Sequence, residues 1–239
     1  MNKIYSQEFQ LRTSDFDCRG QIKPSAVLDL FQEVAGAHAI ELGVGFDDLL
    51  KKELIWVIVK VKFRIENDIK EHQKVIVKTW PLPAGRVTLQ REYLIEDKSG
   101  KILVKGTSEW VTVHSEKRRI VPPTNVYPLE EYCEDKMFEE KLVKVPDFTD
   151  ISVKIEVNSE FCDLDRNGHV NNIRYADYVL NALAPNEEKI RQFQIDFHRE
   201  IMSGMKICVA LGETESGVLA KGLSESGEKM FSCAINLDC

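Results

Sequence analysis

Apolar and polar residues alternate along most of this chain in short runs that end at turn residues. A period of two is typical of strands that bury one face. The pattern predicts two sets of four strands, over residues 54–66, 73–80, 86–96 and 101–114 and then over 192–200, 205–212, 217–223 and 229–237. One further strand is predicted before each set, at 4–11 and at 151–157.

A helix is predicted between the single strand and the four strands of each set. Pro24 suits the first turn of the first helix, and Gly43 suits its end. Asn171 or Asn172 can cap the second helix, which Pro185 ends. Apolar residues recur at helical spacing in both segments: Val27, Leu30, Phe31 and Val34, and then Ile173, Ala176, Val179, Leu180 and Leu183.

The two sets are copies of one unit. Residues 15–22 read DFDCRGQI and residues 163–170 read DLDRNGHV, an offset of 148 positions. We therefore predict an α+β fold in which an antiparallel sheet wraps around one central helix, twice. The expected limits are 1–130 for the first domain, 131–150 for a charged linker with a short helix, and 151–239 for the second domain.

Composition narrows the class of protein. The 239 residues carry a net charge of −7, which argues against nucleic acid as the main partner. Residues 1–130 hold 20 Lys and Arg against 18 Asp and Glu, whereas residues 131–239 hold 12 against 21. No apolar run reaches the length of a membrane span or a signal peptide. The six cysteines lack metal-binding spacing, so free thiols in the cytoplasm are expected.

The second copy holds polar groups that the first copy lacks. Asn167 stands in the place of Arg19, and His169 stands in the place of Gln21. In an extended stretch Asp165, Asn167 and His169 would share a face, just before a helix N-terminus that favours negative charge. This arrangement suits acid–base catalysis with oxyanion stabilisation, although a polar turn and helix cap would need the same residue types.

The segment Asp165-x-Asn167-x-His169-Val170-Asn171-Asn172 resembles the active-site motif of acyl-acyl carrier protein thioesterases. The likeness extends to Ser108–Val111 with Lys117–Pro122, and to Phe197–Glu200. It implies a tandem double hotdog fold and a catalytic set of Asp165, Asn167, His169 and Glu200. Plant members commonly have a cysteine after the glutamate, where this chain has Ile201, so a thiolate nucleophile is excluded at that position.

The implied reaction is hydrolysis of a fatty acyl thioester of acyl carrier protein in fatty acid biosynthesis. In our hypothesis Glu200 and His169 activate a water molecule and Asn167 positions the reactants. Backbone N–H groups around Val170 and Asn171 would stabilise the oxyanion, and Asp165 would orient His169 or Asn167. Direct attack by Asp165 through an anhydride stays open as an alternative.

The resemblance places the acyl chain in the first, non-catalytic copy. We expect the substrate-binding residues to be Val27, Leu28, Phe31, Ala35, Trp56, Ile58 and Asn171. We expect the acidic carrier protein to dock on Lys60, Lys62, Arg64, Lys117, Arg118 and Arg119. No metal or cofactor is implied, and the protein is expected to be a monomer or a homodimer. An acyl-CoA thioesterase and a non-catalytic acyl-binding regulator are the competing functions.

Overall fold

The computed structural model describes residues 3–127, 132–215 and 217–238, which fold into two compact units. The first unit contains Met1–Thr13 and Asp29–Leu142, and the second contains Ser14–Leu28 and Val143–Cys239. The grouping of residues 14–28 with the second unit is not visible in the sequence, which orders segments only along the chain. The expected limits of 1–130 and 151–239 stay a prediction.

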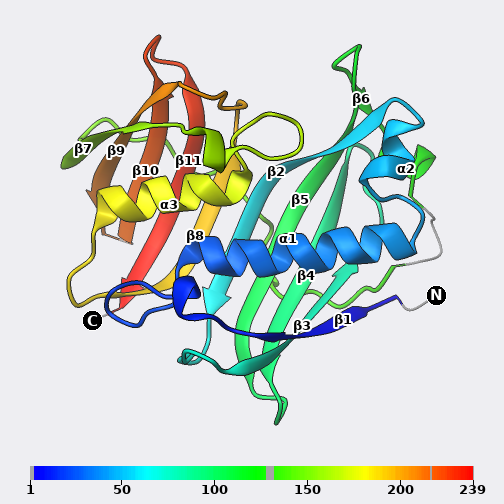
Figure 1. The fold of residues 1–239 in the computed structure, drawn as a ribbon, viewed down its shortest axis with the longest axis horizontal. Coiled ribbons are helices and arrows are strands. Elements are labelled where there is room, and N and C mark those ends of the chain that lie inside the picture. Colours follow the sequence, from blue (N-terminus) through cyan, green and yellow to red (C-terminus); the bar gives the residue numbers. More distant parts are fainter. Residues whose placement is uncertain (1–2, 128–131, 216, 239) are drawn as a thin grey trace. The chain divides into compact units, whose positions relative to one another are not determined.

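Each unit contains one long helix and five main antiparallel strands, and the first unit also has a two-residue strand at Ile120–Val121 (Figure 1). The elements of the first unit are β1 (Tyr5–Gln10), α1 (Pro24–Glu41, of which residues 24–28 group with the second unit), α2 (Phe46–Leu50), β2 (Leu54–Ile65), β3 (Lys74–Pro81), β4 (Thr88–Asp97), β5 (Ile102–His114) and the short β6 (Ile120–Val121). Those of the second unit are β7 (Val153–Asn158), α3 (Asn172–Leu183), β8 (Lys189–Phe197), β9 (Lys206–Thr214), β10 (Gly217–Ser224) and β11 (Lys229–Asp238).

The two sheets have the same strand order. In the first unit the order is β1-β3-β4-β5-β2, and in the second it is β7-β9-β10-β11-β8. In each order the strand that precedes the helix comes first and the strand that follows it comes last. The repeated α+β unit predicted from the sequence is therefore confirmed strand by strand.

A glycine lets α1 approach its sheet closely. Gly106 on β5 pairs with Phe63 on one neighbouring strand and with Tyr93 on the other. The ring of Phe31 lies over this glycine, stacked on Tyr93 with ring centroids 4.2 Å apart and edge-on to Phe63 at 6.4 Å. A Cβ atom on Gly106 would lie 2.3 Å from the Phe31 ring. Because Gly106 has no side chain, the Phe31 ring, and with it α1, can pack directly on the sheet.

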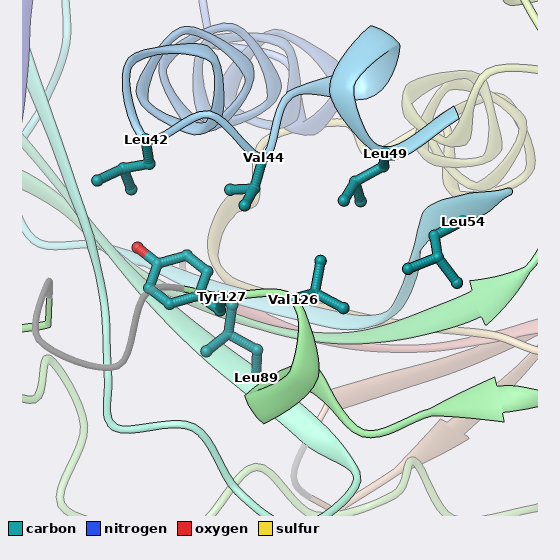
Figure 2. Packing of buried hydrophobic residues seen from close by; sticks show 7 residues of the cluster. All are labelled: Leu42, Val44, Leu49, Leu54, Leu89, Val126 and Tyr127. Atoms are coloured by element: carbon teal, nitrogen blue, oxygen red, sulfur yellow. The ribbon is translucent and has the colours of Figure 1, made fainter. Parts of the chain in front are cut away.

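A second apolar cluster lies at the C-terminal end of α1 (Figure 2). Leu42, Val44 and Leu49, from the end of α1 through α2, face Leu89, Val126 and Tyr127. The chain leaves α1 through Gly43, whose φ of +68° suits glycine. Trp56 packs against the cluster and donates a hydrogen bond from Nε1 to the Val44 carbonyl. The cluster thus packs the segment that contains α2 onto the sheet.

Residues 132–150 connect the two units along the chain. In each unit they run over the sheet face that points away from the helix. In the first unit the Met137 N–H donates to buried Glu92 at 2.7 Å, and Trp80 Nε1 donates to the Asp135 carbonyl at 2.8 Å. In the second unit the Val145 N–H donates to buried Asp196 at 2.8 Å. The hydrogen bond from Lys229 to Asp147 lowers the pKa of that carboxyl to about 2.

Two expectations about local structure are wrong. Residues 132–150 contain no helix, because their backbone groups bond to the two sheets instead. Strand β8 also ends at Phe197 rather than at residue 200, because the His198 and Arg199 N–H groups both donate to the Met230 carbonyl and the chain leaves the ladder. Within the described ranges, no helix has the length and apolar character that a membrane span requires.

Candidate active site

A tight turn carries the polar motif of the second unit. The Asp165 N–H donates to the His169 carbonyl at 2.7 Å, and Gly168, at φ +78°, supplies the left-handed residue that closes the turn. Asp165 Oδ1 accepts the N–H groups of Asn167 and His169 at 2.7 and 3.3 Å. The segment is therefore a turn and not the extended stretch we expected from the alternation of side chains.

The first copy forms the same turn with the same hydrogen bonds. The Asp17 N–H donates to the Gln21 carbonyl, and Asp17 Oδ1 accepts the N–H groups of Arg19 and Gln21 at 2.9 and 3.0 Å. Each bond recurs 148 positions later at Asp165, Asn167 and His169. Because the first copy lacks the histidine, the carboxylate of this turn is a structural requirement of the loop in both copies.

Arg19 makes hydrogen bonds that Asn167, at the equivalent position of the second copy, does not make. Its Nε and Nη2 atoms donate to Asp17, and its Nη1 donates to the carbonyls of Asn186 and Glu188 at 3.2 and 2.8 Å. The guanidinium thereby ties the first turn to the segment that follows α3. In the second copy Asn167 instead donates weakly to Asp165, with Nδ2 3.4 Å from Oδ2. Its amide remains accessible at an exposed position.

His169 and Glu200 form the pair of titratable groups at this site. His169 Nε2 lies 3.6 Å from Glu200 Oε2, and the two side chains are 26% and 39% exposed. Glu200 lies in the loop after β8, which is tied to the motif by the bond from the Val170 N–H to the Ile201 carbonyl at 2.8 Å and by a bridge between His169 and Met202. The structure thus brings together two residues that are 31 positions apart.

Glu66, the counterpart of Glu200, has cationic neighbours. Its Oε1 atom pairs with Arg64 at 2.7 Å and lies 4.0 Å from Lys105. A glutamate at this place in the fold is therefore shared by both copies, whereas a facing histidine is present only in the second. Ile201, directly after Glu200, is fully buried and has no access to solvent.

Two of the backbone N–H groups in the region expected to stabilise the oxyanion already donate to other backbone groups. The Val170 N–H donates to Ile201, and the Asn171 N–H donates to the Asp163 carbonyl at 2.8 Å. Asn171 is the cap of α3, since its side chain accepts the Ile173 N–H at 3.1 Å. Within the part of the chain that the structure describes, the Asn172 N–H is the first helical donor with no assigned acceptor.

Two tyrosines of α3 belong to the site's surroundings and were not predicted. Burial, above all, raises the pKa of Tyr175 to about 12, and its hydroxyl bonds to the backbone beside Glu200. The Tyr178 hydroxyl donates to Asp163 at 3.0 Å. Both are buried where the apolar pattern led us to expect Ile173, Leu180 and Leu183, which are only half-buried. Two tyrosines three positions apart on an apolar helix were the available signal.

The expected acyl-chain residues are divided between the units. Phe31, Ala35, Trp56 and Ile58 are in the first unit, where the first two are buried and the others are half-buried. Val27 and Leu28 are buried and group with the second unit.

The expected docking residues differ in how much surface they offer. Lys60 pairs with Glu109 and Lys62 with Glu140, both at 2.8 Å, and the Lys62 side chain is only 10% exposed. Arg64 is half-exposed beside Glu66. Lys117, Arg118 and Arg119 are exposed on the turn between β5 and β6. Among the described residues, no cluster of His, Cys, Asp and Glu has an arrangement that fits a metal ion.

Comparison with known proteins finds two domain models of one family that together match nearly the whole chain. Residues 2–127 match the model of the acyl-ACP thioesterase N-terminal domain, and residues 148–236 match that of the C-terminal domain. The palmitoyl-acyl carrier protein thioesterase of Arabidopsis thaliana is 28% identical over 215 residues, which are 82% of this chain and 52% of that protein. The chain thus spans about half the length of the curated relatives it matches first.

Solved structures share the fold. An acyl-ACP thioesterase from Bacteroides thetaiotaomicron superposes with a TM-score of 0.86 at 21% identity, covering 99% of this chain and 98% of its own. A 12:0-ACP thioesterase from Umbellularia californica gives the same TM-score and identity over 100% and 98% of the two chains. The expected tandem double hotdog is therefore confirmed.

Proposed function

The chain belongs to the acyl-ACP thioesterase family, and on that premise we propose that it hydrolyses fatty acyl thioesters of acyl carrier protein in fatty acid biosynthesis. The observation that carries the proposal is the His169–Glu200 pair, 3.6 Å apart, with His169 two residues before the N-cap of α3. A histidine paired with a carboxylate is an arrangement that activates water for acyl transfer. The products are a free fatty acid and the carrier protein.

The reaction divides among the residues of this site. The oxygen of a water molecule forms a bond to the thioester carbonyl carbon while its proton passes to the His169–Glu200 pair. The Asn167 amide and the Asn172 N–H stabilise the negative oxygen of the tetrahedral intermediate. The carbon–sulfur bond then breaks, and the pantetheine thiolate takes the proton. Asp165 organises the turn that holds Asn167 and His169, as Asp17 does in the first copy.

A single turnover in isotopically labelled water tests the role of Asp165. We expect label in the fatty acid and none in the peptide that contains Asp165, because Oδ1 of this carboxylate already accepts two backbone N–H groups. Mass spectrometry of the product and of a proteolytic digest makes the measurement. Label in the Asp165 peptide would show that this carboxylate attacks the thioester and that water does not.

We propose that the acyl chain occupies the interior of the first unit, beside Phe31, Ala35, Trp56 and Ile58. Enlarging Ala35 to Leu should lower kcat/KM for long chains relative to short ones by roughly 10-fold, the scale of one methylene group that an apolar pocket rejects. Glu33→Leu on the exposed face of the same helix is the control. Equal profiles in both variants and the wild type would place the chain elsewhere.

We propose that Lys117, Arg118 and Arg119, together with Arg64 near the end of β2, dock the acidic carrier protein. Replacing Arg118 and Arg119 together by Glu should raise KM for the carrier-protein substrate several-fold at low salt, and less at high salt because ions screen exposed charges. Acyl-CoA lacks the carrier's acidic surface, so its KM is the internal control. An unchanged KM for the carrier-protein substrate at low salt would move the docking surface away from this turn.

Hydrolysis of a panel of acyl-ACP thioesters of different lengths, with the matching acyl-CoA thioesters, tests the function itself. Higher kcat/KM on the carrier-protein substrates supports the proposal. Preference for acyl-CoA would favour an acyl-CoA thioesterase, and tight acyl binding without turnover would favour a regulator. A location in the cytoplasm, action without a cofactor, and a monomeric or homodimeric state stay predictions.

A further inference from the structure

Tyr175 is a buried tyrosine whose ring is fixed by the core of the second unit. It lies in the first turn of α3 and is 1% exposed. Phe197 and Phe231 pack edge-on against its ring, each with centroids 5.4 Å away. Gly222 pairs with Phe231 across the sheet, and a Cβ atom there would lie 2.1 Å from the Phe231 ring. These contacts fix the Tyr175 ring and therefore the direction of its hydroxyl group.

The hydroxyl holds the backbone on both sides of Glu200. It accepts the N–H of Ile201 at 3.0 Å and donates to the carbonyl of Arg199 at 3.3 Å. The bond from the Val170 N–H to the Ile201 carbonyl fixes the same peptide from the side of the motif. Glu200 therefore stands on a three-residue segment with hydrogen bonds to a rigid helix and to the loop of His169.

The hydroxyl is suited to this role at neutral pH. Burial is the largest cause that raises the pKa of Tyr175 to about 12, so the group keeps its proton and can donate to a carbonyl. At the equivalent position, 148 residues earlier, the first copy has Val27. There the counterpart Glu66 pairs with Arg64. The tyrosine occurs in the copy where a glutamate faces a histidine.

We infer that Tyr175 is a positioning residue for the reaction proposed above: its hydroxyl fixes residues 199–201 and so keeps the Glu200 carboxylate within reach of His169. The inference rests on the proposed function, because it assigns Tyr175 a role in that same site. Tyr175 acts through Glu200, with its ring in the core and its hydroxyl bonded to backbone.

The variant Tyr175→Phe removes the hydroxyl and keeps the ring. We expect kcat to fall about 10-fold or more, the scale of losses when a catalytic group is misplaced, with KM changed less than about 2-fold. Tyr178→Phe is the matched control: it removes a buried hydroxyl from the same helix, but one bonded to Asp163 at 3.0 Å. A general loosening of α3 would lower kcat in both variants, whereas our inference requires the loss in Tyr175→Phe alone.

A double-mutant cycle with Glu200→Gln separates positioning from stability. If Tyr175 acts through Glu200, adding Tyr175→Phe to Glu200→Gln costs no further activity, whereas independent effects would multiply. Multiplied losses, or full kcat in folded Tyr175→Phe, would overturn the inference. Should Tyr175→Phe not fold, hydrogen exchange of the Ile201 N–H in the wild type decides: protection supports the bond, and rapid exchange contradicts it. A wild type that hydrolyses no acyl thioester would defeat the proposed function instead.

Discussion

Replacing His169 by Gln is expected to lower kcat by ~10²- to 10⁴-fold, the contribution of a positioned acid–base group. The substitution should leave the fold intact. Gln21 occupies the equivalent position of the first copy, where its N–H and carbonyl make the same bonds to Asp17 that His169 makes to Asp165. Steady-state hydrolysis of an acyl-ACP substrate, with circular dichroism as the folding check, makes the measurement.

Glutamate variants supply the matched comparison. Glu200→Gln should cause a loss of similar size, because it removes the carboxylate 3.6 Å from His169. Glu66→Gln makes the same chemical change at the equivalent place of the first unit, where the carboxylate pairs with Arg64, and should leave kcat within about 2-fold. Wild-type turnover in folded His169→Gln would remove this residue from the mechanism. Equal losses of kcat in Glu200→Gln and Glu66→Gln would indicate a structural cause.

The second large effect is on stability. Gly106→Ala should lower the free energy of unfolding by ~1–3 kcal/mol, as overpacking of a filled core does. The added Cβ would lie 2.3 and 2.4 Å from two atoms of the Phe31 ring, and that ring cannot yield because it is stacked on buried Tyr93. Urea unfolding followed by circular dichroism gives the measurement.

Two further variants make this prediction specific. Gly36→Ala lies in α1, the helix that carries Phe31, and the new Cβ would have no atom near it. This variant should be neutral or stabilise by up to ~1 kcal/mol through helix propensity. Phe31→Leu should destabilise the wild type but recover part of the loss in Gly106→Ala, because the two side chains compete for one space. Additive losses in the double variant would show that Phe31 and Gly106 do not meet as described.

The order and type of the long elements were predictable because one face of each is buried. The alternation at 60–65 and the helical spacing of Val27, Phe31 and Val34 follow directly from burial against the other layer. The short α2 was not predictable, since five residues carry no readable period. The predicted end of β8 was three residues too late. Backbone hydrogen bonds to the Met230 carbonyl end the strand, and the side chains at these positions carry no signal of them.

The candidate residues of the site could be read from the sequence, but their hydrogen bonds could not. The motif and Glu200 came from the repeat and the family likeness, and the structure places His169 beside Glu200. Whether the Val170 and Asn171 N–H groups are available depends on which carbonyls the fold brings to them, and Ile201 and Asp163 occupy both. Lys62 looked exposed on a charged strand face, but Glu140 and the Phe138 ring cover its ammonium group.

The matching hydrogen bonds of the two turns separate folding from chemistry. Asp17 and Asp165 hold the backbone of their loops in the same way, so the side chains at the other positions are not needed for the loop to form. The first copy forms this turn without a histidine, and Arg19 there donates to the carbonyl of Glu188. The same independence has a practical use, because an inactive but folded His169→Gln protein would serve as a trap for the intact substrate complex.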